Sequence, residues 1–307
     1  MAGGVQGKKR RAAIGAVAVL LIGGGGAAAV FAANASQPSL EATPSATAAV
    51  PPPRTASPSP TPTVDGFPEN DRRYDQGELP VVDVFSLHPD LPVDEARFAP
   101  TEGIVAQPRE AGAPVFADPR GEPVAWLPHA QAYDGTVVPV IEKQDHWVRV
   151  LLVGRQALPG EGDPAQLTGW MRTADVALAD NPHRVEVDIS DRTVRIVTRD
   201  GKSETEQLVA DDFGWGASAT PTPLGRAFVM FVDVVESFAY TRGHPLVYLS
   251  VQSPTLPGFG GQPVAVTAFH YHDARSGPIS NGCIRVSAEA IQALQQLPLG
   301  TPVFIRE

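Results

Sequence analysis

One cysteine and two histidines near the C-terminus carry the side chains best suited to covalent chemistry. Cys283 is the only cysteine in the 307-residue chain; it follows His270 by thirteen positions, and His272 lies between them. A thiolate attacks acyl carbonyls well, but a free thiol is mostly protonated at neutral pH and needs a neighbouring base or positive dipole. These residues therefore predict acyl transfer through Cys283, with His270 or His272 as the base.

The residues before Cys283 are typical of a tight turn. Ser280, Asn281 and Gly282 favour turn conformations, so we expect Cys283 to lie where the turn ends. Successive backbone N–H groups in such a turn can point at one spot and stabilise an oxyanion. A lone cysteine is more often an inert buried side chain than a nucleophile. The turn before Cys283 is the feature that favours a nucleophile here.

Two segments resemble a known family. The run Ser280-Asn281-Gly282-Cys283-Ile284-Arg285 is similar to the active-site signature of L,D-transpeptidases, in which a histidine on a strand precedes Ser-(His/Asn/Lys)-Gly-Cys-(Ile/Val)-(Arg/Asn). Thr222-Pro223-Leu224-Gly225 is similar to the family's Thr-Pro-x-Gly loop. The resemblance covers residues 183–307 and implies a catalytic domain that is mainly β, an L,D-transpeptidase-type β-sandwich.

The resemblance also implies a reaction and its catalytic residues. Cys283 would attack the carbonyl of the third residue of a peptidoglycan tetrapeptide stem, expel D-alanine and pass the acyl group to an amine of a neighbouring stem. His270 would be the base, oriented by the backbone carbonyl of Tyr271, and the N–H groups of Gly282 and Cys283 would bind the oxyanion. No metal or organic cofactor is expected.

Four further residues are predicted to shape or contact the substrate site. Arg285 would hold a substrate carboxylate or brace the loop, His272 is the second candidate base, and Ser280 and Asn281 belong to the turn. The loop between His270 and Cys283 is shorter than is common in the family. A sortase-like cysteine transpeptidase and a non-catalytic cell-wall-binding protein remain the alternatives.

Strand patterns around these residues predict the elements that position them. Alternation from Val185 to Val197 predicts a hairpin, residues 227–235 and 246–251 predict two further strands, and residues 264–269 predict the strand that delivers His270. Ser287 is a predicted helix N-cap, and an apolar stripe with helical spacing follows it before residues 298–300 end the helix. A last strand is expected at residues 301–306.

Residues 101–179 contain short apolar runs separated by turn residues, at 113–116, 124–127, 136–141, 147–152 and 169–171. Short strands at this spacing favour a small β-barrel, which resembles the bacterial SH3-like module of wall-associated enzymes. Trp126, Trp147 and Trp170 would form either the core of this barrel, the preferred interpretation, or a groove for glycan or peptide. Residues 71–100 have no predicted role.

The N-terminal part of the chain predicts that the protein is exported from the cytoplasm. Residues 1–11 end in four basic side chains, and residues 12–33 are uncharged and long enough to span a bilayer. We expect a transmembrane anchor, with cleavage near Ala33–Ala35 as the alternative, followed by a Pro-rich linker at residues 34–70. With a net charge of −10, the chain is not expected to bind nucleic acid. The predicted location is the cell envelope, and the sequence predicts no oligomeric state.

Overall fold

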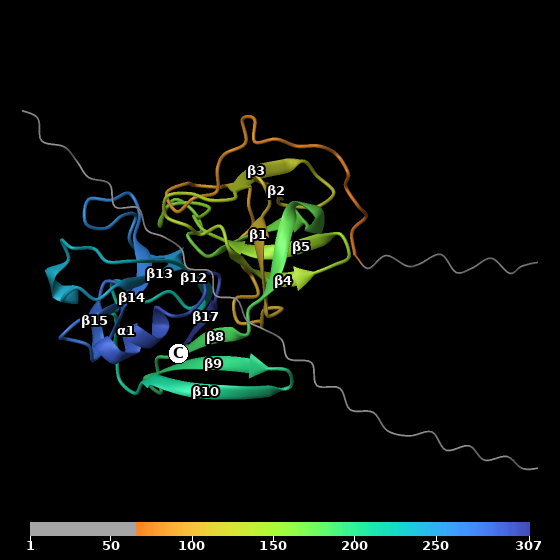
Figure 1. The fold of residues 1–307 in the computed structure, drawn as a ribbon. Helices are drawn as coiled ribbons and strands as arrows, with labels where there is room; N and C mark the ends of the chain where they lie inside the picture. The colour runs from red at the N-terminus through yellow and green to blue at the C-terminus, as the bar shows by residue number, and fades with distance from the viewer. Residues whose placement is uncertain (1–65) are drawn as a thin grey trace, which may run out of the picture. The chain divides into compact units, whose positions relative to one another are not determined.

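The computed structural model describes residues 66–307, which are mainly β (Figure 1). The predicted basic segment, the predicted membrane segment at residues 12–33 and most of the predicted linker lie outside the described residues. Within residues 66–307, no helix combines the length and apolar character needed to cross a bilayer. The described strands form two sheets.

The first sheet has seven strands in the order β3-β2-β6-β5-β4-β1-β7, and every neighbouring pair is antiparallel. All five strands predicted between residues 101 and 179 overlap a strand of this sheet. The SH3-like resemblance of this module stays a prediction. Its strands are β1 (Ile104–Pro108), β2 (Gly112–Phe116), β3 (Pro123–Pro128), β4 (Val138–Lys143), β5 (Trp147–Leu152), β6 (Leu167–Arg172) and β7 (Val176–Asp180), with a 3-10 turn, η1 (Thr173–Asp175), before β7.

The three tryptophans of this module are buried. Trp147 is 0% exposed, and Trp126 and Trp170 are 6% and 7% exposed. The Trp147 indole donates a hydrogen bond to the Pro68 carbonyl oxygen at 2.8 Å, and the Phe67 ring lies edge-on to Trp170. The tryptophans are therefore buried and do not form an open groove. Phe67 and Pro68, predicted as part of the linker, contact Trp170 and Trp147.

The second sheet has ten strands in the order β10-β9-β8-β17-β12-β13-β14-β16-β11-β15. Three neighbouring pairs are parallel: β8 with β17, β14 with β16, and β11 with β15. The strands are β8 (His183–Asp188), β9 (Thr193–Asp200), β10 (Ser203–Ala210), β11 (Gly214–Gly216), β12 (Gly225–Asp233), β13 (Leu246–Gln252), β14 (Val266–Tyr271), β15 (Gly277–Ser280), β16 (Ile284–Val286) and β17 (Pro302–Arg306), with a 3-10 turn, η2 (Ala239–Thr241), between β12 and β13.

The α-helix of this module, α1 (Ala288–Leu294), begins where the sequence predicts. The Ser287 hydroxyl accepts a hydrogen bond from the Ala290 N–H at 3.2 Å and so satisfies a backbone donor that the first turn leaves unpaired. Helix α1 packs against β10, β13 and β14, beside which Figure 1 shows it. The buried side chains Ile291 and Leu294 fix its inner face in the core of the module.

The segment that the sequence left without a role, residues 71–100, joins the two sheets. The carboxylate of Asp94 pairs with the guanidinium of Arg226 in β12 at 2.7 and 2.9 Å, and both side chains are buried. The Gln252 amide at the end of β13 donates to the Val84 carbonyl oxygen at 2.9 Å. A buried two-point ion pair is costly to break, because removal of one partner leaves the other charge unpaired. On the other side of the segment, the Thr168 N–H of β6 donates to the Pro92 carbonyl oxygen at 2.8 Å, so residues 71–100 contact both sheets.

Candidate active site

The parallel pairing of β14 with β16 brings the cysteine loop to the strand that carries His270. Phe269 lies opposite Ile284, and His270 lies opposite Arg285, so the residue before β16, Cys283, lies beside Ala268. The Cys283 sulfur is 4.0 Å from the carbonyl oxygen of Val266. Alternate residues of a strand share a face, so the thiol and the His270 imidazole belong to the same region of the sheet. In residues 66–307, no direct hydrogen bond joins these two side chains.

The environment of His270 suits a general base. Its Nδ1 is 2.9 Å from the Tyr271 carbonyl oxygen. A carbonyl oxygen only accepts, so Nδ1 carries the proton and Nε2 keeps a free lone pair. His270 is 5% exposed, and burial, followed by the nearby positive charge of Arg285, lowers its pKa to about 4. The imidazole is therefore neutral at pH 7, in the tautomer that a base requires.

His272, the second candidate base, has the other tautomer. Its Nδ1 accepts a hydrogen bond from the Ala274 backbone N–H at 2.9 Å, so the neutral ring carries its proton on Nε2. The residue is more exposed than His270 and lies two positions further along the chain, just beyond the end of β14. Burial lowers its pKa as well. Of the two histidines, His270 has the geometry of the base.

The Cys283 thiol is neutral in the resting site. The residue is partly exposed, yet its sulfur is closely surrounded, and burial raises the pKa of the thiol. The backbone N–H of Ala268 and then the positive charge of Arg285 act in the opposite direction, but burial is the larger effect. A neutral thiol near a neutral imidazole implies that the proton moves as the sulfur attacks, with no preformed thiolate.

Ser280 organises the cysteine loop. Its hydroxyl donates to the Cys283 carbonyl oxygen at 2.6 Å and accepts from the Gly282 N–H at 3.1 Å. Its own carbonyl accepts from the Thr220 hydroxyl at 3.0 Å and from the Ala217 N–H at 2.9 Å. The loop is thus fixed from inside and tied to the segment before Thr222-Pro223-Leu224-Gly225.

These contacts alter the predicted oxyanion site. Gly282 has φ +109°, which is in the region that glycine adopts most readily. Its N–H, predicted as an oxyanion donor, is directed to the Ser280 hydroxyl instead. The Cys283 N–H is the remaining donor of the predicted pair. A turn in the sequence indicates that N–H groups converge, but it does not tell whether a side chain within the turn has taken one of them.

Arg285 and Asn281 border this loop. The Arg285 guanidinium reaches the Ala274 carbonyl oxygen at 3.5 Å, and its Nε atom is buried without a hydrogen-bond partner in the described part of the chain. Buried polar atoms are usually paired, so this unpaired Nε is an exception in the described part of the chain. Asn281 is exposed at the tip of the turn. Residues 66–307 contain no group of three or more His, Cys, Asp or Glu side chains placed to hold a metal ion.

Comparison with protein families identifies this module. Residues 182–305 match the family model of the L,D-transpeptidase catalytic domain, YkuD. This part of the chain is an L,D-transpeptidase catalytic domain. The resemblance noted in the cysteine loop is thereby confirmed, and so is the enzyme class. No curated protein matches the chain.

Several solved structures are similar to the chain. An L,D-transpeptidase from Mycobacterium smegmatis is 15% identical, with a TM-score of 0.29, and the match covers 53% of this chain and 91% of that one. An L,D-transpeptidase from Mycobacterium tuberculosis H37Rv is 16% identical, with a TM-score of 0.28 and coverages of 53% and 91%. The catalytic domain of the E. faecium L,D-transpeptidase is 23% identical, with a TM-score of 0.25 and coverages of 40% and 95%.

Tyr240 is a residue of the L,D-transpeptidase site that the sequence did not single out. It belongs to η2, the 3-10 turn between β12 and β13. Its ring lies 5.3 Å from that of His270 and 5.6 Å from that of His272, between centroids. Burial, and then the nearby Cys283, raises its pKa, so the phenol stays protonated as a hydrogen-bond donor. No local motif marks Tyr240; only the fold brings it to β14.

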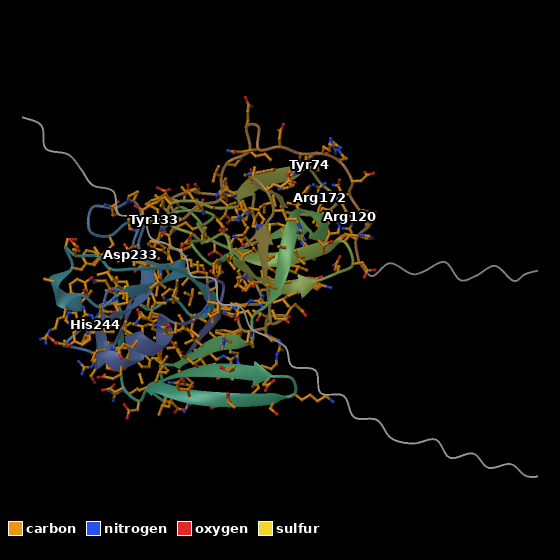
Figure 2. All side chains as sticks on the ribbon, in the orientation of Figure 1. Tyr74, Arg120, Tyr133, Arg172, Asp233 and His244 are labelled. Atoms are coloured by element: carbon orange, nitrogen blue, oxygen red, sulfur yellow. The ribbon has the colours of Figure 1, made fainter. Side chains whose placement is uncertain are left out.

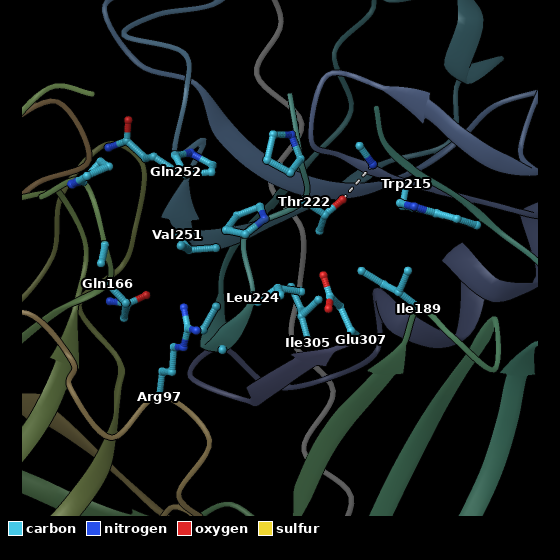
Figure 3. Close-up of a pocket in the computed structure, with 18 of the residues that line it drawn as sticks. Arg97, Gln166, Ile189, Trp215, Thr222, Leu224, Val251, Gln252, Ile305 and Glu307 are labelled. Carbon is cyan, nitrogen blue, oxygen red and sulfur yellow. Dashed lines mark hydrogen bonds between the residues drawn. The ribbon is translucent and has the colours of Figure 1, made fainter. Parts of the chain in front are cut away.

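A cavity of about 630 Å³ is lined in part by the Thr-Pro loop (Figure 3). It is lined by residues of both modules, including Arg97, Gln166, Trp215 and Leu224, but not by Cys283 or His270. At its edge the Thr222 hydroxyl accepts a hydrogen bond from the Gly216 N–H at 2.9 Å (Figure 3). This hydrogen bond ties the Thr-Pro loop to β11, in which Gly216 pairs with Ser280 of β15.

Proposed function

We propose that the protein is a peptidoglycan L,D-transpeptidase in which Cys283 carries the acyl group and His270 is the base. One observation supports the proposal most directly. Within a domain that matches the L,D-transpeptidase family, the Tyr271 carbonyl oxygen, 2.9 Å from Nδ1, orients the His270 imidazole, which is neutral at pH 7. A base must be unprotonated and correctly oriented before the substrate arrives.

Acylation begins with a neutral thiol and a neutral imidazole. As the Cys283 sulfur bonds to the carbonyl carbon of the third stem residue, Nε2 of His270 takes the thiol proton. The Cys283 N–H supports the negative charge that develops on the carbonyl oxygen. The tetrahedral intermediate collapses, the C–N bond to D-alanine breaks, and His270 returns the proton to the leaving amine. The product of this half-reaction is a thioester on Cys283.

Transfer reverses these roles. The amine of a neighbouring stem attacks the thioester and gives its proton to His270. The C–S bond then breaks, and the sulfur recovers the proton as a thiol. The new amide bond cross-links two stems. Arg285, whose Nε lacks a hydrogen-bond partner within residues 66–307, would bind a carboxylate of one of the stems.

The substrate determines where the domain works. Peptidoglycan lies outside the cytoplasmic membrane, so the catalytic domain is proposed to act in the cell envelope. Residues 12–33 would anchor the chain in the membrane, and the linker at residues 34–70 would give the domain reach into the wall.

The test uses the full-length protein and a purified disaccharide-tetrapeptide, with products and intact protein followed by mass spectrometry. Release of D-alanine with an acyl adduct on Cys283 and a cross-linked dimer, all lost in Cys283→Ala, is the expected result. D-alanine release without a dimer would reassign the acceptor to water. An unmodified Cys283 and an unchanged substrate would overturn the proposal and favour a non-catalytic wall-binding protein.

A further inference from the structure

A row of paired residues crosses the catalytic sheet and ends at Cys283. Phe231 in β12 lies opposite Tyr248 in β13, which in turn lies opposite Ala268 in β14. Residues directly opposite one another in neighbouring antiparallel strands share a face. Cys283, beside Ala268 at the start of the next strand, completes the row. The Phe231 and Tyr248 rings are stacked, with centroids 5.8 Å apart.

The same row continues to Tyr133 of the first module and to Phe85 in the segment at residues 71–100. The Tyr133 ring lies 5.9 Å from Phe231, and the Phe85 ring lies 5.3 Å from Tyr133. Tyr133 is 50% exposed and Phe85 is 41% exposed, and both lie outside residues 182–305. The loop that carries Tyr133 is tied to the catalytic sheet, because the Gly135 N–H donates to the Met230 carbonyl oxygen at 3.2 Å. We call Phe85, Tyr133, Phe231 and Tyr248 the aromatic row.

Polar groups accompany the aromatic row. Asp233, at the end of β12, is exposed, and Figure 2 shows it near Tyr133. Burial raises the pKa of Tyr248 to about 12, so its phenol stays protonated. Asp233 lies two residues beyond Phe231 in β12 and therefore shares its face of the sheet. Aromatic faces beside phenol and carboxylate groups suit a ligand with apolar ring faces and hydroxyl groups at its edges.

We propose that the aromatic row is a binding subsite for the glycan strand, specifically for the sugar that bears the donor stem. The proposal rests on the proposed transpeptidase function and extends it to the first module. The three stem residues between the attacked carbonyl and the sugar span about 10 Å when extended. From β16 to β12 the sheet advances three strand spacings, about 14 Å. The stem would therefore end near Tyr248, two strand spacings from β16, and the glycan would continue from there over Phe231 toward Tyr133.

The test compares two donors, a disaccharide-tetrapeptide and the same tetrapeptide without sugar, by kcat/KM for D-alanine release from the full-length protein. The wild type is expected to prefer the sugar-bearing donor. In the double variant Phe85→Ala/Tyr133→Ala, the ratio of kcat/KM for the sugar-bearing donor to that for the free tetrapeptide is expected to fall about tenfold. The kcat/KM for the free tetrapeptide should not change. Tyr133→Phe keeps the ring and is expected to retain most of it.

The control is Phe98→Ala, which removes an equally exposed ring, 43% exposed, from the same part of the chain. It is expected to leave both donors unaffected. An equal loss on both donors in Phe85→Ala/Tyr133→Ala would mean that the rings only support the fold, and a wild type without sugar preference would also overturn the subsite. A wild type inactive on both donors would instead refute the transpeptidase function itself.

Discussion

The cysteine loop and the tryptophan cluster of the first module are two regions where the sequence offered functional side chains, and the fold uses them in opposite ways. Cys283 ends a turn that hydrogen bonds hold at the surface, and its residue stays partly exposed. Trp147 and Trp170 are buried among other rings, with Phe67 packed over them. The two regions are held by different interactions. Hydrogen bonds to backbone groups and to the Ser280 hydroxyl hold the cysteine loop, whereas burial among apolar side chains holds the tryptophans.

This contrast separates positioning from stability. A residue held at the surface by hydrogen bonds remains accessible to a substrate while its neighbours fix its direction. A large ring that fills a core contributes through the surface it removes from water. Substitutions in the cysteine loop should therefore change the reaction more than the stability, and substitutions in the tryptophan cluster should do the reverse.

The largest effect is expected from Cys283→Ala. Without a nucleophile the acyl intermediate cannot form, so cross-linking activity should fall at least about a thousandfold. Kinetics of D-alanine release would measure the loss, and the thermal midpoint should change little. Retained activity would assign the chemistry to another group and would remove the contrast between the two regions.

The two histidines should differ sharply. His270→Ala removes the neutral base and is expected to lower kcat about 10²- to 10⁴-fold. His272→Ala is its matched control, because the Nδ1 of His272 is occupied by the Ala274 N–H, and it should cost less than about tenfold. Comparable losses in the two variants would show that the tautomers of the resting site do not decide the base.

The tryptophan cluster should respond in stability. Trp147→Ala opens a cavity in a closed core and is expected to lower the free energy of unfolding by about 3–5 kcal/mol. Leu208→Ala is the control, since Leu208 is 53% exposed and should change stability by about 0.5 kcal/mol or less. Urea unfolding of both variants measures the difference. Loss of wall binding with unchanged stability in Trp147→Ala would contradict the core assignment.

Acid should destabilise the protein through His270. Its pKa is about 4 in the folded chain and has a reference value of 6.5, so between these values the unfolded state binds the proton that the folded state excludes. Stability is complete above pH 6.5 and falls as the pH falls toward 4, by about 3 kcal/mol from this group. Urea unfolding at pH 7 and pH 4.5 should show a smaller acid loss in His270→Gln than in the wild type. An identical loss in both would contradict the buried neutral imidazole.

The smallest effect is expected from Ser280→Ala. Loss of the hydroxyl frees the Gly282 N–H and the Cys283 carbonyl oxygen and loosens the turn, which should lower kcat about tenfold with little change in stability. The same steady-state assay measures it. An increase in activity would instead mean that the Gly282 N–H becomes an oxyanion donor once it is released from Ser280.

Much of the local structure could be predicted from the sequence. Strand alternation located the hairpin of β8 and β9, and Ser287 marked the start of α1, because these patterns depend on neighbours along the chain. The helix ends at Leu294, although its apolar stripe continues to Leu297. Helix ends are set by which carbonyls find partners, and a periodic pattern does not record that.

The sequence by itself indicated the chemistry, because it places one cysteine in a turn after a histidine. That turn lies within residues 182–305, which match the L,D-transpeptidase catalytic domain. Tertiary structure decided which histidine has its lone pair free, which N–H is already taken, and that Tyr240 lies against His270. It also gave Tyr133 a place beside the catalytic sheet. Motifs fix residue types over a few positions, whereas tautomers, burial and long-range ring contacts depend on strands that meet only when the chain has folded.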